Sequence, residues 1–196
     1  MGALLQQLNQ ELAAIVERVR PGLVQITTAR HGMGAGIVWH SQGLIVTNAH
    51  VIRDTISQIT LADGRVLPAQ LLGIDRALDL AALAVNGDDL PTLPGYVQAP
   101  PRPGQWVVAL GHPWGVVGAA TAGVVIAVGI PPEMPHLRQE LIQVSLHVRP
   151  GYSGGPLVDE QGQLLGITTM MAGPDVGLAI PCHVVTDFVR HFFQRT

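Results

Sequence analysis

The chain has 196 residues, of which 47% are hydrophobic and 13% are charged, and its formal net charge is -3 at pH 7. This composition lies far from the low hydrophobicity and high charge of disordered chains, and the length suffices for one large domain or two small ones. All eleven basic residues are arginines and they form no run, so the sequence lacks the basic patch that nucleic-acid binding requires. The 23 Gly and 15 Pro favour many short strands joined by turns over a helical bundle.

Several classes of protein are excluded by what the sequence lacks. Cys182 is the single cysteine, which rules out an internal disulfide and a cysteine-based zinc site, and the eight His show no metal-binding spacing. We therefore predict no metal and no cofactor. The uncharged stretch 104–132 is rich in Gly and Ala and is interrupted by His112 and Pro113, so it predicts buried strands rather than a membrane span.

The amino terminus carries no basic start followed by an apolar run, and it is therefore not a secretory signal as written. The compartment stays open: extracytoplasmic if a leader was removed, and cytoplasmic otherwise.

The first predicted element is an amphipathic helix over 4–19, because Leu5, Leu8, Leu12, Ile15 and Val19 repeat with helical spacing. We expect this apolar stripe to pack on the body of the same domain, a neighbouring chain being the alternative. The next segments are short β-branched or alternating runs separated by turn residues, and they predict strands over 23–28, 34–39, 43–47, 57–62, 65–73 and 79–85.

The segment 87–104 is rich in Pro and Gly and has no apolar periodicity, so we interpret it as a linker between two domains. A second set of strands is predicted over 105–111, 121–129, 140–147, 155–159, 163–171 and 176–180. An amphipathic helix begins at Pro181, with an apolar face made by Val184, Val185, Phe188, Val189, Phe192 and Phe193.

This order of elements predicts an all-β fold with about six strands in each half and a helix at each end. Two closed barrels suit the count because closure removes exposed strand edges. The predicted division is an N-terminal helix over 1–20, a first barrel over 21–88, a linker over 89–103, a second barrel over 104–180 and a C-terminal helix over 181–196.

Three short segments carry reactive side chains in strand and turn contexts. His50 follows an apolar strand, Asp79 opens another, and Ser153 lies among glycines in the run 151–155. A serine hydroxyl becomes a good nucleophile when an imidazole can accept its proton, and the imidazole needs a carboxylate on its other nitrogen. The amides of Gly151 and Ser153 could stabilise the developing oxyanion, since glycine permits the tight turn that brings two N–H groups together.

The run 151–155 also fits the nucleophile elbow of α/β-hydrolases, which requires the acid and the histidine to follow the serine. Here both precede Ser153, and no alternation of strands and helices leads up to it. The order His50, Asp79, Ser153 instead matches the arrangement in chymotrypsin.

Five motifs in this order resemble the protease domain of the HtrA (Deg) family of trypsin-like serine proteases: TNAHV, DRALDLAAL, GHPWG, PGYSGGPL and GLAIP. The resemblance runs from about Arg20 to Phe193. It implies a chymotrypsin-like double six-stranded β-barrel with the active site between the barrels. It also implies His50 as general base, Asp79 as its orienting carboxylate, with Asp75 as competitor, and Ser153 as nucleophile.

The resemblance further implies that Gly177, Leu178, Ala179 and Ile180 form the strand that pairs with the substrate backbone and lines the pocket for P1, the residue before the scissile bond. Leu178 and Ile180 then suggest a small apolar P1 residue.

The sequence departs from the family pattern close to the nucleophile. Tyr152 stands where the family usually has Asn, and His147 falls near the floor of the expected pocket, where it could tune P1 preference or respond to pH. The peptide-sensing PDZ module does not follow residue 193. The aromatic residues that commonly build the family's trimer contact are lacking near the front, which leaves homo-oligomer formation open.

Two functions follow from these observations. The first is a serine endopeptidase that acts on unfolded or flexible polypeptides, which would add to the cleft as a β-strand. The second is a catalytically silent peptide-binding or scaffold protein on a protease fold, because the altered segment 144–152 could fail to hold the oxyanion hole open. The expected partners are polypeptide substrates and not nucleic acid.

Overall fold

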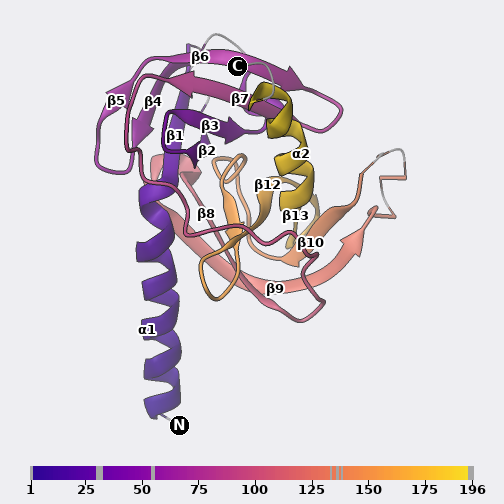
Figure 1. Cartoon of the computed structure of the whole chain (residues 1–196). Coiled ribbons are helices and arrows are strands. Elements are labelled where there is room, and N and C mark those ends of the chain that lie inside the picture. Colours follow the sequence, from indigo (N-terminus) through magenta and orange to yellow (C-terminus); the bar gives the residue numbers. More distant parts are fainter. Residues whose placement is uncertain are drawn as a thin grey trace.

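The structure is a computed structural model that describes residues 2–29, 33–53, 56–132, 134–135, 137 and 139–193. Two sheets lie one above the other, with a long helix projecting from one side and a short helix packed across both (Figure 1). The described helices are α1 (Gly2–Val19) and α2 (Cys182–Phe193), with short 3-10 turns η1 (Arg20–Gly22), η2 (Ala49–Val51) and η3 (Pro113–Gly115).

The first sheet contains seven strands in the order β5-β4-β1-β2-β3-β7-β6. Their bounds are β1 (Leu23–Thr28), β2 (Met33–His40), β3 (Leu44–Thr47), β4 (Ile56–Leu61), β5 (Val66–Leu67), β6 (Ala69–Asp75) and β7 (Leu80–Val85). The predicted single strand over 65–73 is divided at Pro68, because proline has no N–H to donate to a ladder. The order begins at β5 and ends at β6, so this sheet is an open half-barrel rather than the closed one expected.

The second sheet is a closed barrel in the order β10-β13-β12-β11-β8-β9. Its strands are β8 (Trp106–Gly111), β9 (Ala119–Gly129), β10 (Leu141–Ser145), β11 (Pro156–Val158), β12 (Leu164–Gly173) and β13 (Val176–Pro181). The predicted chymotrypsin-like, all-β architecture with terminal helices is therefore confirmed, and Pro181 ends β13 instead of opening α2.

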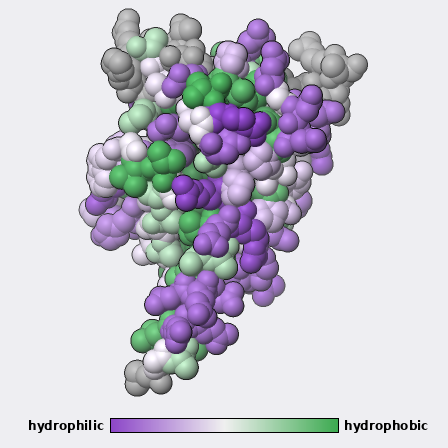
Figure 2. Space-filling view, turned by 90° about the vertical axis from the view of Figure 1, so that its left-hand side faces the viewer, coloured by the Kyte–Doolittle hydropathy of each residue, from purple (hydrophilic) through white to green (hydrophobic). Residues whose placement is uncertain are grey.

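Helix α1 packs on the body only through its last turns. Ile15 and Val19 are buried in the core, whereas Leu4, Leu5 and Leu8 are exposed. Figure 2 shows the helix projecting below the body, with hydrophilic residues over much of its visible surface and apolar side chains towards its free end. The apolar stripe predicted for this helix is thus buried in the core at the carboxyl end of α1 and exposed to solvent at the amino end.

The segment predicted as a linker is bound to both sheets. The amide of Leu90 donates to the carbonyl of Ser41 at 3.0 Å, and the amide of Val97 donates to the carbonyl of Leu164 at 2.9 Å. The rings of Trp39 and Tyr96 stack with their centroids 5.0 Å apart. The division into domains stays a prediction.

Helix α2 closes the structure with its apolar face. Val185, Phe188 and Val189 are buried and Val184 is partly buried against the same core; the side chains of residues 192 and 193 lie outside the described part. Within the described ranges, no helix combines the length and the apolarity needed to cross a membrane.

Candidate active site

His50 and Asp79 are positioned by two neighbouring segments of the first sheet. His50 lies in η2, directly after β3, and Asp79 lies directly before β7, which pairs with β3. The carbonyl of Asp79 accepts hydrogen bonds from the Ala49 amide and from the Asn48 side chain, both at 3.1 Å. Asp79 adopts a left-handed backbone conformation with a φ of 55°, which is uncommon outside glycine and asparagine. These two hydrogen bonds to the Asp79 carbonyl therefore hold an unusual backbone conformation that directs the Asp79 carboxylate towards His50.

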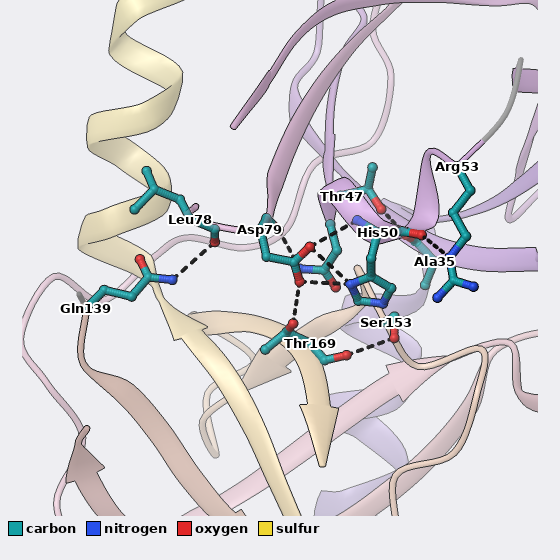
Figure 3. Close-up of polar contacts among 10 residues, drawn as sticks. Ala35, Thr47, His50, Arg53, Leu78, Asp79, Gln139, Ser153 and Thr169 are labelled. Atoms are coloured by element: carbon teal, nitrogen blue, oxygen red, sulfur yellow. Dashed lines mark hydrogen bonds and ion pairs between the residues drawn. The ribbon is translucent and has the colours of Figure 1, made fainter. Parts of the chain in front are cut away.

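The side chains of His50 and Asp79 lie within hydrogen-bond distance of each other (Figure 3). Nδ1 of His50 lies 2.8 Å from Oδ2 and 3.1 Å from Oδ1 of Asp79, and the His50 amide donates to Oδ1 at 3.0 Å. Because an ionised carboxylate only accepts hydrogen bonds, the proton is assigned to Nδ1 of His50. In neutral His50, Nε2 is then the basic nitrogen.

The hydroxyl of Thr169, in β12, donates to Oδ2 of Asp79 at 2.5 Å. Burial disfavours the charged form of Asp79, but the hydrogen bonds from His50 and Thr169 outweigh it and hold the pKa of this carboxyl below its usual value. The carboxylate is therefore ionised at neutral pH and can stabilise an imidazolium.

Asp75, the competing acid, has a different role. Its Oδ1 accepts the amides of Ala77 and Leu78, both at 2.9 Å, and so shapes the turn that leads to Asp79. The geometry places Asp79, and not Asp75, against His50.

Ser153 is held at the junction of the two sheets. Its carbonyl accepts the amide of Ala35 from β2 at 2.8 Å, and the amide of Gly154 donates to the carbonyl of Thr168 in β12 at 2.9 Å. Gly154 has a φ of +86°, and a Cβ there would overlap the carbonyl oxygen of Ala35 and the hydroxyl of Thr47. Only glycine fits where the chain comes this close to Ala35 and Thr47, and this close contact fixes Ser153 between the first sheet and the second barrel.

The hydroxyl of Ser153 donates to the carbonyl of Thr169 at 2.9 Å rather than to His50. Both side chains line the same cavity, and Figure 3 shows the hydroxyl on the side of the imidazole that faces away from Asp79. In free enzymes the contact between nucleophile and base is often loose and tightens when substrate binds.

The two amides expected to hold an oxyanion are those of Gly151 and Ser153. Neither donates to an acceptor among the described residues, whereas the neighbouring amides of Tyr152, Gly154 and Gly155 all do. Gly151 has a φ of +110°, and a Cβ there would lie 2.5 Å from the carbonyl oxygen of His112. This glycine-dependent turn thus leaves two N–H groups beside the nucleophile without a partner in the described part of the chain.

His50, Asp79 and Ser153 line one cavity of about 830 Å³. Its other described walls are Thr28, Met33, Val51, Arg53, Arg76, the segment 148–152 and the segment 168–171. Tyr152 contributes to this wall although its side chain is mostly buried. Among the residues that the structure describes, no group of three or more His, Cys, Asp or Glu could hold a metal ion.

His147 lies apart from the described cavity wall. Its side chain is exposed, and its Nε2 lies 3.0 Å from Oδ1 of Asp175, at the tip between β12 and β13. The expected position of His147 near the pocket floor is corrected to the surface beside Asp175, because the side chain turns outward to this carboxylate, and its effect on P1 preference stays a prediction.

The expectation for Gly177, Leu178, Ala179 and Ile180 also needs correction. These residues lie in β13, which pairs with β10 on one side and β12 on the other, so no backbone edge is left for a substrate strand. They are buried and do not line the cavity. The free edge belongs instead to β12 beyond Thr168, since the pairing with β11 ends at Ile167 and the last backbone hydrogen bonds to the preceding turn are made by Thr168.

Sequence reasoning missed Thr169, Met170 and Met171, which form the cavity wall along this free edge. One signal was present: Thr168 and Thr169 are two adjacent polar residues at the end of an apolar strand, and both are buried. A buried hydroxyl needs a partner, which for Thr169 is Asp79.

The sequence and the structure were compared with known proteins. The protein-family model of the trypsin-like peptidase domain matches residues 34–167. The mitochondrial serine protease HTRA2 of Drosophila persimilis is 36% identical over 168 residues, which are 83% of this chain and 38% of that protein.

Solved structures are similar over most of the chain. The serine endoprotease from Yersinia pestis superposes with a TM-score of 0.81 at 31% identity, covering 92% of this chain and 65% of that one. An HtrA-type protease with a tripeptide superposes with a TM-score of 0.82 at 31% identity, covering 91% of this chain and 62% of that one. The chain thus spans less than two thirds of the length of these relatives.

Proposed function

Because the chain belongs to the HtrA family of trypsin-like serine proteases, we propose that it is a serine endopeptidase that cleaves unfolded or flexible polypeptides. The observation that carries this proposal is the hydrogen-bonded pair of His50 and Asp79 in the cavity that Ser153 also lines. This pair leaves Nε2 of His50, the proton-accepting nitrogen, on the side of the imidazole where Ser153 lies.

The first chemical step is acylation of Ser153. Its hydroxyl oxygen attacks the scissile carbonyl carbon while Nε2 of His50 takes the hydroxyl proton. The ionised Asp79 stabilises the resulting imidazolium, and its hydrogen bonds fix the ring orientation. His50 then gives the proton to the leaving amine, and water repeats the sequence to release the acyl group.

The negative charge on the carbonyl oxygen needs preorganised donors. The amides of Gly151 and Ser153 are suited to this role because no described acceptor takes them. A single donor of this kind contributes roughly 2.7–4 kcal/mol to transition-state stabilisation.

The polypeptide would bind along the free edge of β12, at residues 169–171. Main-chain hydrogen bonds to this edge require an extended segment and are independent of side-chain identity. Folded regions cannot present such a strand, which supports unfolded or flexible polypeptides as substrates. Val148, Met170 and Met171 provide an apolar surface next to Ser153 for the P1 side chain.

The test is labelling with a serine-directed fluorophosphonate, followed by mass-spectrometric mapping of the modified residue. We expect modification of Ser153 and hydrolysis of unfolded casein, and loss of both in Ser153→Ala. Ser145→Ala is the matched control, since Ser145 is an exposed serine of β10 outside the cavity wall. A native protein that binds peptides but is neither labelled nor active would overturn the proposal in favour of the silent peptide-binding protein.

A further inference from the structure

The cavity that holds Ser153 is rich in positive charge. Arg53, Arg76 and Arg149 line it, and Asp79 is the single carboxylate among its described lining residues. The chain as a whole has 14 acidic residues against 11 arginines. A cationic cleft in an acidic chain is therefore a local feature and not a reflection of net charge.

Asp79 does not neutralise these arginines. Its two carboxylate oxygens accept hydrogen bonds from His50 and Thr169, and its side chain is largely buried beneath the histidine. None of the three arginines forms an ion pair with a carboxylate in the part of the chain that the structure describes. Asp175 lies near Arg149 in a smaller adjoining recess, outside the described wall of the Ser153 cavity, and its Oδ1 is 3.0 Å from Nε2 of His147.

Two of the guanidinium groups are anchored at the cavity wall. Nε of Arg53 donates to the carbonyl of His50 at 3.0 Å, and Nη1 of Arg149 donates to the carbonyl of Val148 at 3.2 Å. In Figure 3, Arg53 lies on the opposite side of His50 from Asp79. Each guanidinium has five N–H donors, so one anchoring bond orients the group and leaves the others available to a ligand.

Apolar side chains share the cavity wall with the arginines: Met33, Val51, Val148, Met170 and Met171. A ligand that complements this surface combines an apolar side chain with negative charge close to it. Carboxylates suit the arginines because a guanidinium binds a carboxylate through two parallel hydrogen bonds.

We propose that Arg53, Arg76 and Arg149 make the cleft selective for polypeptide segments in which acidic residues flank the apolar residue at the scissile bond. This inference rests on the proposed function, since it takes the cavity to be a peptide-binding cleft. Charges of one sign that line a cleft focus their field and raise the local concentration of oppositely charged ligands.

The test measures binding separately from cleavage. Two ten-residue peptides carry the same fluorescent label and the same central apolar residues; one has flanking Asp and Glu, and the other has Asn and Gln at those positions. Their affinities for the Ser153→Ala protein are measured by fluorescence anisotropy. We expect the acidic peptide to bind about tenfold more tightly at low salt, because several modest ion pairs add together.

The preference should shrink as the ionic strength rises, since salt screens exposed charges. This salt titration requires no substitution in the cleft. In Arg53→Gln, Arg76→Gln and Arg149→Gln, each made on the Ser153→Ala background, the preference for the acidic peptide should fall by about two- to fivefold. Arg102→Gln is the matched control, because Arg102 is exposed and lies outside the cavity wall.

Equal affinity for both peptides at low salt would overturn the inference, as would a preference that the three cleft variants retain in full. Either result leaves the proposed function standing if Ser153 of the native protein is labelled by the phosphonate. Conversely, an acidic preference in a protein that cleaves nothing would support the cationic cleft and reject the peptidase.

Discussion

The hydroxyl of Thr169 donates a 2.5 Å hydrogen bond to the carboxylate of Asp79, across an interval of 90 residues. Thr169 lies in β12 of the closed barrel, and Asp79 precedes β7 of the first sheet. The same carboxylate holds Nδ1 of His50, while the carbonyl of Thr169 accepts the hydroxyl of Ser153. One residue of the second barrel therefore contacts both the acid and the nucleophile, and the candidate site is assembled only when the two halves are joined.

Replacing Thr169 by Val should raise the pKa of Asp79 and destabilise the protein at neutral pH. A hydrogen bond to a charged group contributes about 1.5–3 kcal/mol, and Val removes it with little change in shape. The pKa of Asp79 in the folded state lies below its ordinary value of 3.8, so this stabilisation is present above that value and is lost as the pH falls through the folded pKa. Urea unfolding should show a gap between wild type and Thr169→Val at pH 7 that narrows towards pH 3.

Thr169→Ser is the control for this measurement because it keeps the hydroxyl. A gap that stays constant with pH would contradict the assignment, since it would reflect packing of the methyl group and not the charge on Asp79.

Replacing Asp79 by Asn should lower kcat on a peptide substrate by about 10⁴, as in a comparable triad where the amide fixes the wrong histidine tautomer. The comparison variant is Asp75→Asn, because Asp75 caps the preceding turn and an Asn can make the same turn contacts. Steady-state kinetics of both variants should therefore differ by orders of magnitude. Similar losses in the two would remove Asp79 from the role of orienting carboxylate.

The sequence was informative where the signal is local. The predicted strand over 23–28 coincides with β1, and the turn glycines around Ser153 identify a segment that hydrogen-bonds to β2. Alternation and turn residues act over a few positions, so they need no knowledge of the partner strand. The same holds for the choice of Asp79 over Asp75, which a motif match indicated and the hydrogen bonds support.

Features that depend on pairing between distant strands could not be predicted from local patterns. The apolar run 177–180 is typical of a strand, but only the barrel order shows that both of its edges are already paired. Likewise, Thr169 resembles any polar strand residue until β12 is placed beside the turn that holds Asp79. The open edge beyond Thr168 arises because β11 is much shorter than β12, and this difference was not evident from the composition of either strand.

Replacing Gly154 by Ala should destabilise the protein strongly. The substitution adds a Cβ against the Ala35 carbonyl and the Thr47 hydroxyl, at a backbone φ of +86°. The matched control is Gly104→Ala, since Gly104 has the same φ of +86° but no atom within 4 Å of the added Cβ. We expect a loss of about 1 kcal/mol for Gly104→Ala from backbone strain alone, and more than about 3 kcal/mol for Gly154→Ala. The two losses in free energy of unfolding are measured with urea, and their difference reports the close approach between the two halves at Gly154. Equal losses would contradict this role of Gly154.

A last prediction concerns the buried His112, which is 3% exposed and lies in the turn beside Gly151. Its Nδ1 accepts the amide of Gly118 at 3.3 Å, and burial lowers its pKa from 6.5, an effect that the nearby Val24 backbone partly offsets. Since the unfolded chain takes up this proton more readily, His112 stabilises the fold fully above pH 6.5 and progressively less as the pH falls through its folded pKa.

In His112→Gln, the free energy of unfolding should therefore depend less on pH between 7 and 5 than it does in the wild type. A proton bound only in the unfolded state changes stability by about 1.4 kcal/mol per pH unit, which sets the largest difference in slope. The measurement is urea unfolding at closely spaced pH values. Equal slopes in the two proteins would contradict this prediction, because they would show that the imidazole binds a proton as readily in the folded turn as in the unfolded chain.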